Sequence, residues 1–257
     1  MSVHLVGGGW SVGVETDVFG RFVEEAGERA KARGSRTARV VVVAVRDGDQ
    51  DEHAAKLRAA LRAAGDALDV DVTVAPAAVA EGERLPDAAL APEGEPVDGI
   101  VVGGGLTPAY LDAVAPQADA IRAHVVAGAP YLGFSAGAMI APDQALIGGW
   151  RIGGVEVSPE DGAEDLDDVT VVPGLGLVDV TVDVHAAQWG NLSRLVAAVE
   201  SGLLDGGVAI DEDTVLVVGQ GGLVVGGRGN VWRAVRTGGD ADAGAAGVIV
   251  STLVVVG

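Results

Sequence analysis

The chain has no cysteine among its 257 residues. Disulfide bonds, thiolate metal sites and cysteine nucleophiles are therefore all excluded. Lysine is almost missing as well, since only Lys31 and Lys56 occur, and the formal net charge is −20. Nucleic-acid binding needs a basic surface, which a chain of this composition does not offer. We therefore expect no nucleic acid among its partners.

The large negative charge has two explanations. An acidic, lysine-poor surface keeps the proteins of halophiles soluble at high salt, so we hypothesise a halophile-like surface. A genome rich in G and C favours Ala, Gly, Val, Arg and Asp, and would explain the composition but less easily the size of the charge. The sequence leaves both explanations open.

Long hydrophobic runs are also missing. No stretch of 18 or more apolar residues occurs, so we expect no membrane span. Residues 1–10 lack the basic start and the apolar core of a signal peptide, which favours a cytoplasmic protein. The chain is nevertheless 49% hydrophobic, and its length suits one large α/β domain. We expect residues 1–257 to form that single domain.

Patterns typical of strands and helices alternate through the first two thirds of the chain. Short apolar runs rich in β-branched residues predict strands buried on both faces, and the segments between them have helical spacing. This alternation predicts a three-layer α/β fold, a mostly parallel sheet with helices on both faces. We expect residues 75–97, which are rich in proline, to be irregular, and the strands after residue 147 to extend the sheet or add antiparallel strands. The early strands are expected at residues 3–6, 39–45, 70–74 and 99–102.

Glycine turns follow three of the expected strands. They lie at residues 7–9, at residues 103–105 and around Ser135. In an open parallel sheet, ligands bind beyond the carboxyl ends of the strands. We therefore expect the three turns to converge on one crevice.

The third turn, Gly133-x-Ser135-x-Gly137, fits a nucleophile elbow. In such an elbow the serine lies on a strained strand-to-helix turn, and small flanking residues avoid collisions with the neighbouring strand and helix. The backbone N–H of Ala136 would point at the same place and could hold a developing oxyanion. A tight glycine turn without chemistry has the same pattern, but the strand before it and the helical segment after it favour the elbow.

A serine nucleophile needs a base, and the chain has four histidines. His4 falls inside a strand, and His53 and His124 fall on expected helices. His185 ends a strand just before a loop, where a base could reach the crevice, and is the best candidate. The carboxylate that would orient it is either Asp183 or a member of the acidic cluster 211–213, and spacing does not decide between them.

Several segments together resemble one family, the serine peptidases that include cyanophycinase and the aspartyl dipeptidase called dipeptidase E. The resemblance covers nearly the whole chain, from about Val3 to Val235. The segments that carry it occur in the family's order, at residues 101–107, 133–138, 182–185 and 209–214.

The resemblance implies a fold related to class I glutamine amidotransferases, a flavodoxin-like arrangement. It also implies that Ser135 is the nucleophile, His185 the base and Glu212 the third member of the triad. The oxyanion would be held by the N–H of Ala136 and that of Gly104 or Gly105. No metal or organic cofactor is implied, and a homodimer is possible.

The sequence departs from the family at the expected substrate site. Cyanophycinases carry several arginines just after the histidine, which bind substrate carboxylates. Here only Arg194 remains, Trp189 and Asn191 stand where arginines are expected, and Thr107 replaces the usual glutamine after the glycine turn. We expect these four residues and Asp183 to contact the substrate. Because the clamp for acidic groups is mostly missing, we expect a small-peptide hydrolase of different specificity, of the exopeptidase or dipeptidase type.

Two alternatives belong to other classes. The lost arginines could mark a non-catalytic relative that binds a small ligand. The Gly7-x-Gly9 turn could mark a dinucleotide site, but the spacing to Gly13 is one residue too long. An acidic residue at the end of the second strand could be Asp47, although Arg46 stands beside it.

Overall fold

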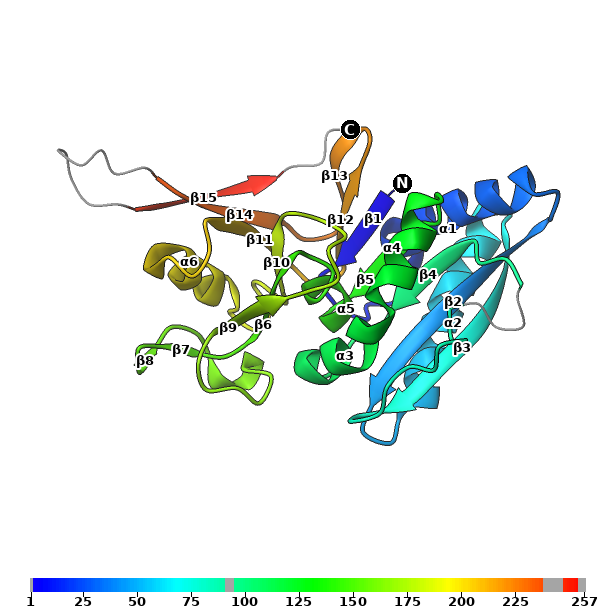
Figure 1. Ribbon diagram of the computed structural model, residues 1–257. Helices are drawn as coiled ribbons and strands as arrows, with labels where there is room; N and C mark the ends of the chain where they lie inside the picture. Colours follow the sequence, from blue (N-terminus) through cyan, green and yellow to red (C-terminus); the bar gives the residue numbers. More distant parts are fainter. Residues whose placement is uncertain (1, 91–94, 238–246, 254–257) are drawn as a thin grey trace.

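The computed structural model describes residues 2–90, 95–237 and 247–253 (Figure 1). A seven-stranded sheet forms its centre, in the order β13-β12-β1-β5-β4-β2-β3. The pairs from β1 through β5, β4 and β2 to β3 are parallel, and β12 and β13 add an antiparallel edge beside β1. The strands are β1 (Ser2–Val6), β2 (Thr37–Arg46), β3 (Asp71–Ala80), β4 (Gly99–Val102), β5 (Tyr131–Phe134), β12 (Thr214–Gly219) and β13 (Gly222–Gly227).

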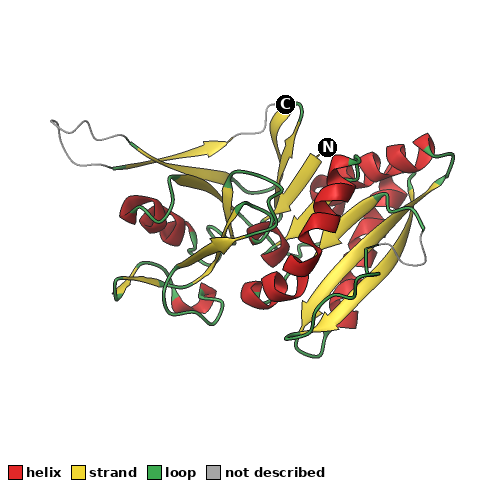
Figure 2. Ribbon diagram, in the orientation of Figure 1, coloured by secondary structure: helices red, strands yellow, loops and turns green. Residues whose placement is uncertain are grey.

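Helices cover both faces of this sheet, as the alternating pattern predicts (Figure 2). The strand β2 shows why its sequence is apolar throughout. Val40, Val42 and Ala44 belong to the core beneath α1 (Glu15–Ala32) and α2 (Gln50–Leu68). Val41 and Val43 belong to the core on the other face, under α3 (Thr107–Val114) and α4 (Ala118–Val126). The expected three-layer α/β fold is confirmed.

The C-terminal third builds more than an edge to the first sheet. A second, four-stranded sheet has the order β10-β11-β14-β15, with β10 and β11 parallel and the other pairs antiparallel. One hydrophobic core joins the two sheets, since Val182 and Ile210 of the second pack in the same cluster as Leu5 and Leu216 of the first. The strands are β10 (Thr181–Val184), β11 (Gly206–Ile210), β14 (Val231–Arg236) and β15 (Val248–Leu253), and α6 (Leu192–Ser201) packs against them.

Smaller elements connect the two sheets. After β5 come α5 (Ala136–Met139), the antiparallel pair of β6 (Gln144–Gly148) with β9 (Thr170–Pro173), and the short pair of β7 (Arg151–Ile152) with β8 (Val155–Glu156). Two 3-10 turns lie at Ala115–Gln117 and Glu160–Gly162. Among the described helices, none is both long and apolar enough to cross a membrane.

The expectation that residues 75–97 are irregular is wrong for their first part. Strand β3 continues to Ala80 and pairs with the whole length of β2, from Thr37 opposite Asp71 to Arg46 opposite Ala80. Pro76 is tolerated within it because β3 is an edge strand, with a partner on one side only. Residues 91–94 of the same segment lie outside the described residues.

Candidate active site

The turn at Ser135 has the geometry of a nucleophile elbow. Strand β5 ends at Phe134 and α5 begins at Ala136. Ser135, between them, has φ 52° and ψ −110°, a conformation that side-chain-bearing residues rarely adopt. Its N–H donates to the carbonyl of Val6 on β1 at 2.9 Å, and its carbonyl accepts from the N–H of Ala138 at 2.8 Å. Hydrogen bonds to β1 and to α5 therefore hold the strained turn.

The glycines that flank the serine are required by close backbone contacts. A Cβ on Gly137 would collide with the carbonyl oxygen of Val102 on β4. A Cβ on Gly133 would collide with the carbonyl of Gly137. The elbow therefore packs so tightly against β4 and itself that neither position has room for a side chain.

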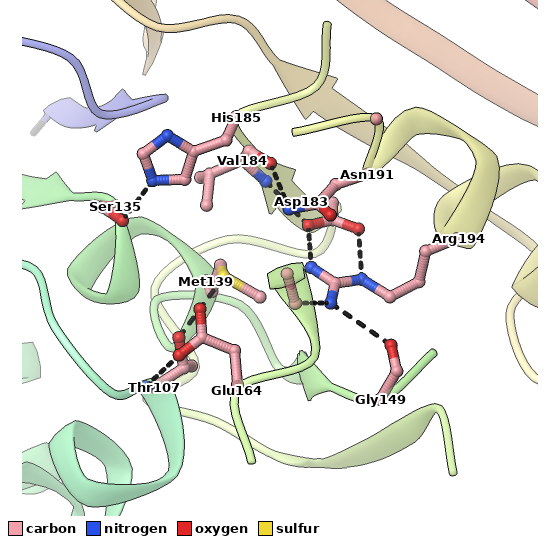
Figure 3. Close-up of polar contacts among 12 residues, drawn as sticks. Thr107, Ser135, Met139, Gly149, Glu164, Asp183, Val184, His185, Asn191 and Arg194 are labelled. Carbon is pink, nitrogen blue, oxygen red and sulfur yellow. Dashed lines mark hydrogen bonds and ion pairs between the residues drawn. The ribbon is translucent and has the colours of Figure 1, made fainter. Parts of the chain in front are cut away.

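Ser135 begins a chain of two hydrogen bonds. Its Oγ lies 2.8 Å from Nε2 of His185 (Figure 3), and Nδ1 of His185 lies 2.7 Å from Oε1 of Glu212. The three residues follow the strands β5, β10 and β11, so their side chains meet at the carboxyl ends of strands from both sheets. Glu212 is thus the member of the acidic cluster that contacts the histidine. Asp211 instead accepts hydrogen bonds from the Trp232 side chain and from backbone N–H groups.

His185 is held on every side. The backbone N–H of His185 donates to the carbonyl of Gly7 at 3.1 Å. Gly8 lies so close to the imidazole that a Cβ there would overlap the ring. On another side the ring of Trp189 stacks on it, with centroids 3.8 Å apart and planes 6° from parallel. The first glycine turn therefore packs under the histidine.

The protonation of His185 suits a base. Burial lowers its pKa, the bond and charge of Glu212 raise it, and the net result lies below the ordinary value of 6.5. At neutral pH the ring is therefore uncharged. Nδ1 then carries the proton that is donated to Glu212, and Nε2 is free to accept the serine proton.

The second glycine turn is clamped by three side chains. The Gly104 N–H donates to Nε2 of His53 at 3.1 Å. The Gly104 carbonyl accepts from the Tyr110 hydroxyl at 3.1 Å and from Nη1 of Arg46 at 3.3 Å. Because a trans peptide directs its N–H away from its carbonyl, the Gly105 N–H points away from Tyr110 and Arg46. Of the two expected oxyanion donors in this turn, Gly104 is engaged, and Gly105 has no acceptor among the described residues.

His53 is a neutral acceptor in this clamp. Burial, followed by the charge of Arg46, lowers its pKa to about 4. The sequence pattern placed it on a helix, which is correct, but gave it no role. His53 reaches the turn only because α2 packs beside Gly103, the residue that follows β4.

A cavity of about 890 Å³, the cleft, lies over the serine, the histidine and the second glycine turn. Gly9, Gly105 and Ser135 all line it, so the three glycine turns converge as expected. Sites for small ligands commonly have volumes of about 300–1,000 Å³. Other parts of its wall, which no sequence motif indicated, come from Trp10, Trp150, the first half of α2, and residues 160–161 and 163–167. Within the described part of the chain, no group of three or more acidic or histidine side chains is placed to hold a metal ion.

Comparison with known proteins decides the family. The model of peptidase family S51 matches residues 38–225. The chain belongs to this family. The resemblance to cyanophycinase and dipeptidase E is therefore confirmed, and the protein is a serine-type peptidase.

A solved structure agrees with the fold of this S51 peptidase. A peptidase from an acI-B1 Actinobacterium is similar with a TM-score of 0.58 at 20% identity, over 90% of this chain and 88% of that one. A candidate peptidase E protein from Listeria monocytogenes EGD-e has a TM-score of 0.46 at 17% identity, over 89% and 98%, which is too low to support any argument. No curated protein matches the chain significantly.

Two of the residues expected to bind substrate are buried in the S51 peptidase. Arg194 and Asp183 are both fully buried and form a bidentate ion pair, with N–O distances of 2.6 and 2.9 Å (Figure 3). Arg194 also donates to the carbonyls of Gly149 and Gly162. A buried guanidinium needs such partners, because leaving a charge unpaired in the interior is very costly. The pair therefore fastens the segment after β6 to β10 and does not line the cleft.

Asn191 and Thr107 are also turned away from the cleft of the S51 peptidase. The Asn191 amide donates to the carbonyl of Val184 at 3.0 Å, and the residue is 1% exposed. Thr107 is buried, and its N–H donates to the carboxylate of Glu164 at 2.8 Å. Of the five residues expected at the substrate, only Trp189 lines the cleft.

The elbow geometry predicts that Gly137→Ala destabilises the S51 peptidase. The added methyl group meets the backbone of β4, so we expect a loss of about 1–3 kcal/mol or more in the free energy of unfolding, as for other overpacked sites. Urea unfolding followed by circular dichroism measures it. The control is Gly221→Ala, where a Cβ meets nothing within 4 Å, and we expect a change within about 0.5 kcal/mol. Equal effects would contradict the packing argument.

The lowered pKa of His185 predicts the pH dependence of the nucleophile. We expect the rate at which a fluorophosphonate probe labels Ser135 to be high at neutral pH. The rate should fall as the pH drops through the His185 pKa, because the protonated ring accepts no proton. The midpoint should lie below 6.5, the ordinary histidine value. A midpoint above 6.5, with the fold intact by circular dichroism, would contradict the burial argument.

Proposed function

We propose that this S51 peptidase hydrolyses small peptides through an acyl-enzyme on Ser135. The observation that carries the proposal is the unbroken series of hydrogen bonds from Ser135 through His185 to Glu212. A serine hydroxyl is a weak nucleophile by itself, and a base at hydrogen-bond distance activates it. The strained elbow supports the same proposal, because such strain persists where function needs it.

The proposed reaction proceeds in two halves. Nε2 of His185 takes the proton of Ser135 Oγ while the oxygen attacks the peptide carbonyl carbon. The histidine then gives that proton to the leaving amine, the C–N bond breaks, and the acyl group stays on Ser135. A water, deprotonated by the same histidine, attacks the ester carbonyl carbon. The C–O bond to Ser135 then breaks, the acid leaves, and His185 returns the proton to Ser135 Oγ. Glu212 keeps the ring in the required tautomer and stabilises its cationic form in both halves.

The oxyanion of the tetrahedral intermediate is proposed to bind the N–H groups of Ala136 and Gly105. Ala136 directly follows the nucleophile, and Gly105 has the free N–H of the second glycine turn. The contacts of Tyr110 and Arg46 with the Gly104 carbonyl fix the orientation of the Gly105 N–H. They also polarise that peptide, and a polarised peptide is a better donor. Donors fixed in advance are the most effective, because they need no reorganisation during the reaction.

The cleft supports the choice of short peptides as substrates, and two other features argue against the dinucleotide-binding and non-catalytic alternatives. The cleft is walled on several sides and close in size to small-ligand sites, which favours short chains over folded proteins. The space around the first glycine turn is occupied by the protein's own residues, since His185 lies against Gly8 and Asp213 lies against Gly9. That packing leaves no place for a pyrophosphate. The intact triad argues against a non-catalytic relative.

The direct test compares peptide hydrolysis by the wild type and by Ser135→Ala. A defined peptide mixture, followed by mass spectrometry in low and high salt, reports both activity and the end that is trimmed. We expect Ser135→Ala to lower the rate about 10⁴-fold or more, and Glu212→Gln to lower it about 10²–10⁴-fold. Ser193→Ala, an exposed serine on α6, is the matched control and should retain full activity. Hydrolysis by Ser135→Ala at more than a tenth of the wild-type rate would refute the proposal.

The oxyanion assignment predicts a selective defect in Tyr110→Phe. This change removes one bond to the Gly104 carbonyl and leaves the ring in place. We expect kcat to fall about tenfold with KM nearly unchanged, less than the 10²–10³-fold loss of a donor itself. A peptide aldehyde, which forms an oxyanion with Ser135, should bind more weakly to the variant, whereas the matching alcohol should bind equally. Equal losses for both ligands would indicate a general packing defect instead.

A further inference from the structure

The two arginines near the serine are already paired. Beneath the cleft, Arg194 is committed to Asp183 and has no exposed surface. On its wall, both guanidinium contacts of Arg46 with Asp49 are hydrogen bonds, at 2.9 and 3.0 Å. The ammonium of Lys56 lies 4.1 Å from the centre of a tryptophan ring. A substrate carboxylate would therefore have to displace an aspartate to pair with either arginine, and among the described residues Lys56 is the one Lys or Arg of the cleft outside a salt bridge.

A further electropositive group beside the cleft, the N-terminus of α3, is also occupied. Such a helix end attracts anions. Here the carboxylate of Glu164, from a distant loop, accepts the Thr107 N–H at 2.8 Å (Figure 3). Glu164 and Asp165 both have positive φ, 56° and 59°, a backbone conformation that residues with side chains rarely adopt. The chain thus tolerates strain in the loop that sets these two carboxylates on the cleft wall.

Acidic side chains dominate the cleft. Eight of its 23 lining residues are Asp or Glu, against 37 in the whole chain of 257, so the cleft exceeds the general acidity of the protein. Arg46 and Lys56 are its two basic residues. Among the described residues, no salt bridge involves Glu52, Glu160 or Asp165. Like charges around a concave site reinforce one another and attract ions of the opposite sign.

We propose that this peptidase selects peptides that carry a lysine or arginine side chain next to the scissile bond, in place of an acidic one. The inference rests on the proposed peptidase function of Ser135 and names its substrate class. A cationic side chain is attracted by the carboxylates that form no salt bridge, and no existing ion pair has to break for it to bind. A carboxylate in the same place is repelled by them, and Lys56 alone among the Lys and Arg side chains of the cleft could oppose that repulsion.

The test is a set of short peptides that differ at one position beside the scissile bond, with Lys, Gln or Glu there. We expect kcat/KM to be at least tenfold higher for Lys than for Gln, and lower still for Glu. The preference should shrink as KCl is raised, because salt screens charges at the surface of the cleft. Circular dichroism at each salt concentration confirms that the protein stays folded.

Charge-removing variants locate the effect. Glu160 and Asp165 are exposed, so Glu160→Gln with Asp165→Asn removes two cleft charges without emptying the core. We expect this double variant to lose several-fold of the Lys-over-Gln preference. The control is Glu28→Gln, on the exposed face of α1. The side chain of the adjacent Arg29 donates hydrogen bonds to the carbonyls of Val97 and Ala127, in the segments before β4 and β5. The preference of Glu28→Gln should equal that of the wild type.

The outcomes separate this inference from the proposed function. If the fluorophosphonate probe labels Ser135 and the Gln or Glu peptide is cleaved as fast as the Lys peptide, the charge preference is refuted and the peptidase function stands. If no peptide is cleaved and Ser135 is not labelled, the proposed function fails, and the inference fails with it. An equal loss of preference in Glu28→Gln would assign the effect to the overall charge, and would also refute the role of the cleft.

Discussion

The site depends on the close approach of the first glycine turn to the histidine. Gly8 carries no side chain, so the turn after β1 can lie directly against the His185 ring, and the Gly7 carbonyl accepts the backbone N–H of His185. β1 is also the strand that bonds to the Ser135 N–H. One short backbone segment thus sets both ends of the Ser135–His185 bond. Any side chain at Gly8 would separate the two sheets where they supply the triad.

The sequence predicts the first sheet well because its signals are local. Runs such as residues 40–45 are apolar and rich in β-branched valine, a pattern typical of a parallel strand covered on both faces. Glycine and proline positions predicted the turns and the start of α3. The continuation of β3 through Pro76 was missed, because pairing with β2 overrides a local signal that usually ends a strand. The separate second sheet was missed for a related reason, since alternating strands do not reveal which partners they choose.

The site divides in the same way. The elbow was predictable because its small residues are adjacent in sequence, and the structure does bring Ser135, His185 and Glu212 together. The substrate wall was not predictable, because it consists of contacts between distant segments, such as His53 with the second glycine turn. Arg194 shows the limit most clearly. Its position in the sequence suggested a substrate ligand, yet Asp183 and two carbonyl groups retain it in the interior. Charge pairing within the fold cannot be seen from spacing.

The triad takes its members from two different sheets. Ser135 follows a strand of the seven-stranded sheet, whereas His185 and Glu212 follow strands of the four-stranded one. The 2.8 Å bond between Ser135 and His185 is therefore also a measure of how the two sheets are docked. A relative shift of about 1 Å would leave each sheet folded and yet cost the reaction roughly 10²-fold. The apolar side chains that the two sheets share, Val182 and Ile210 beside Leu5 and Leu216, therefore keep the site aligned as well as the protein folded.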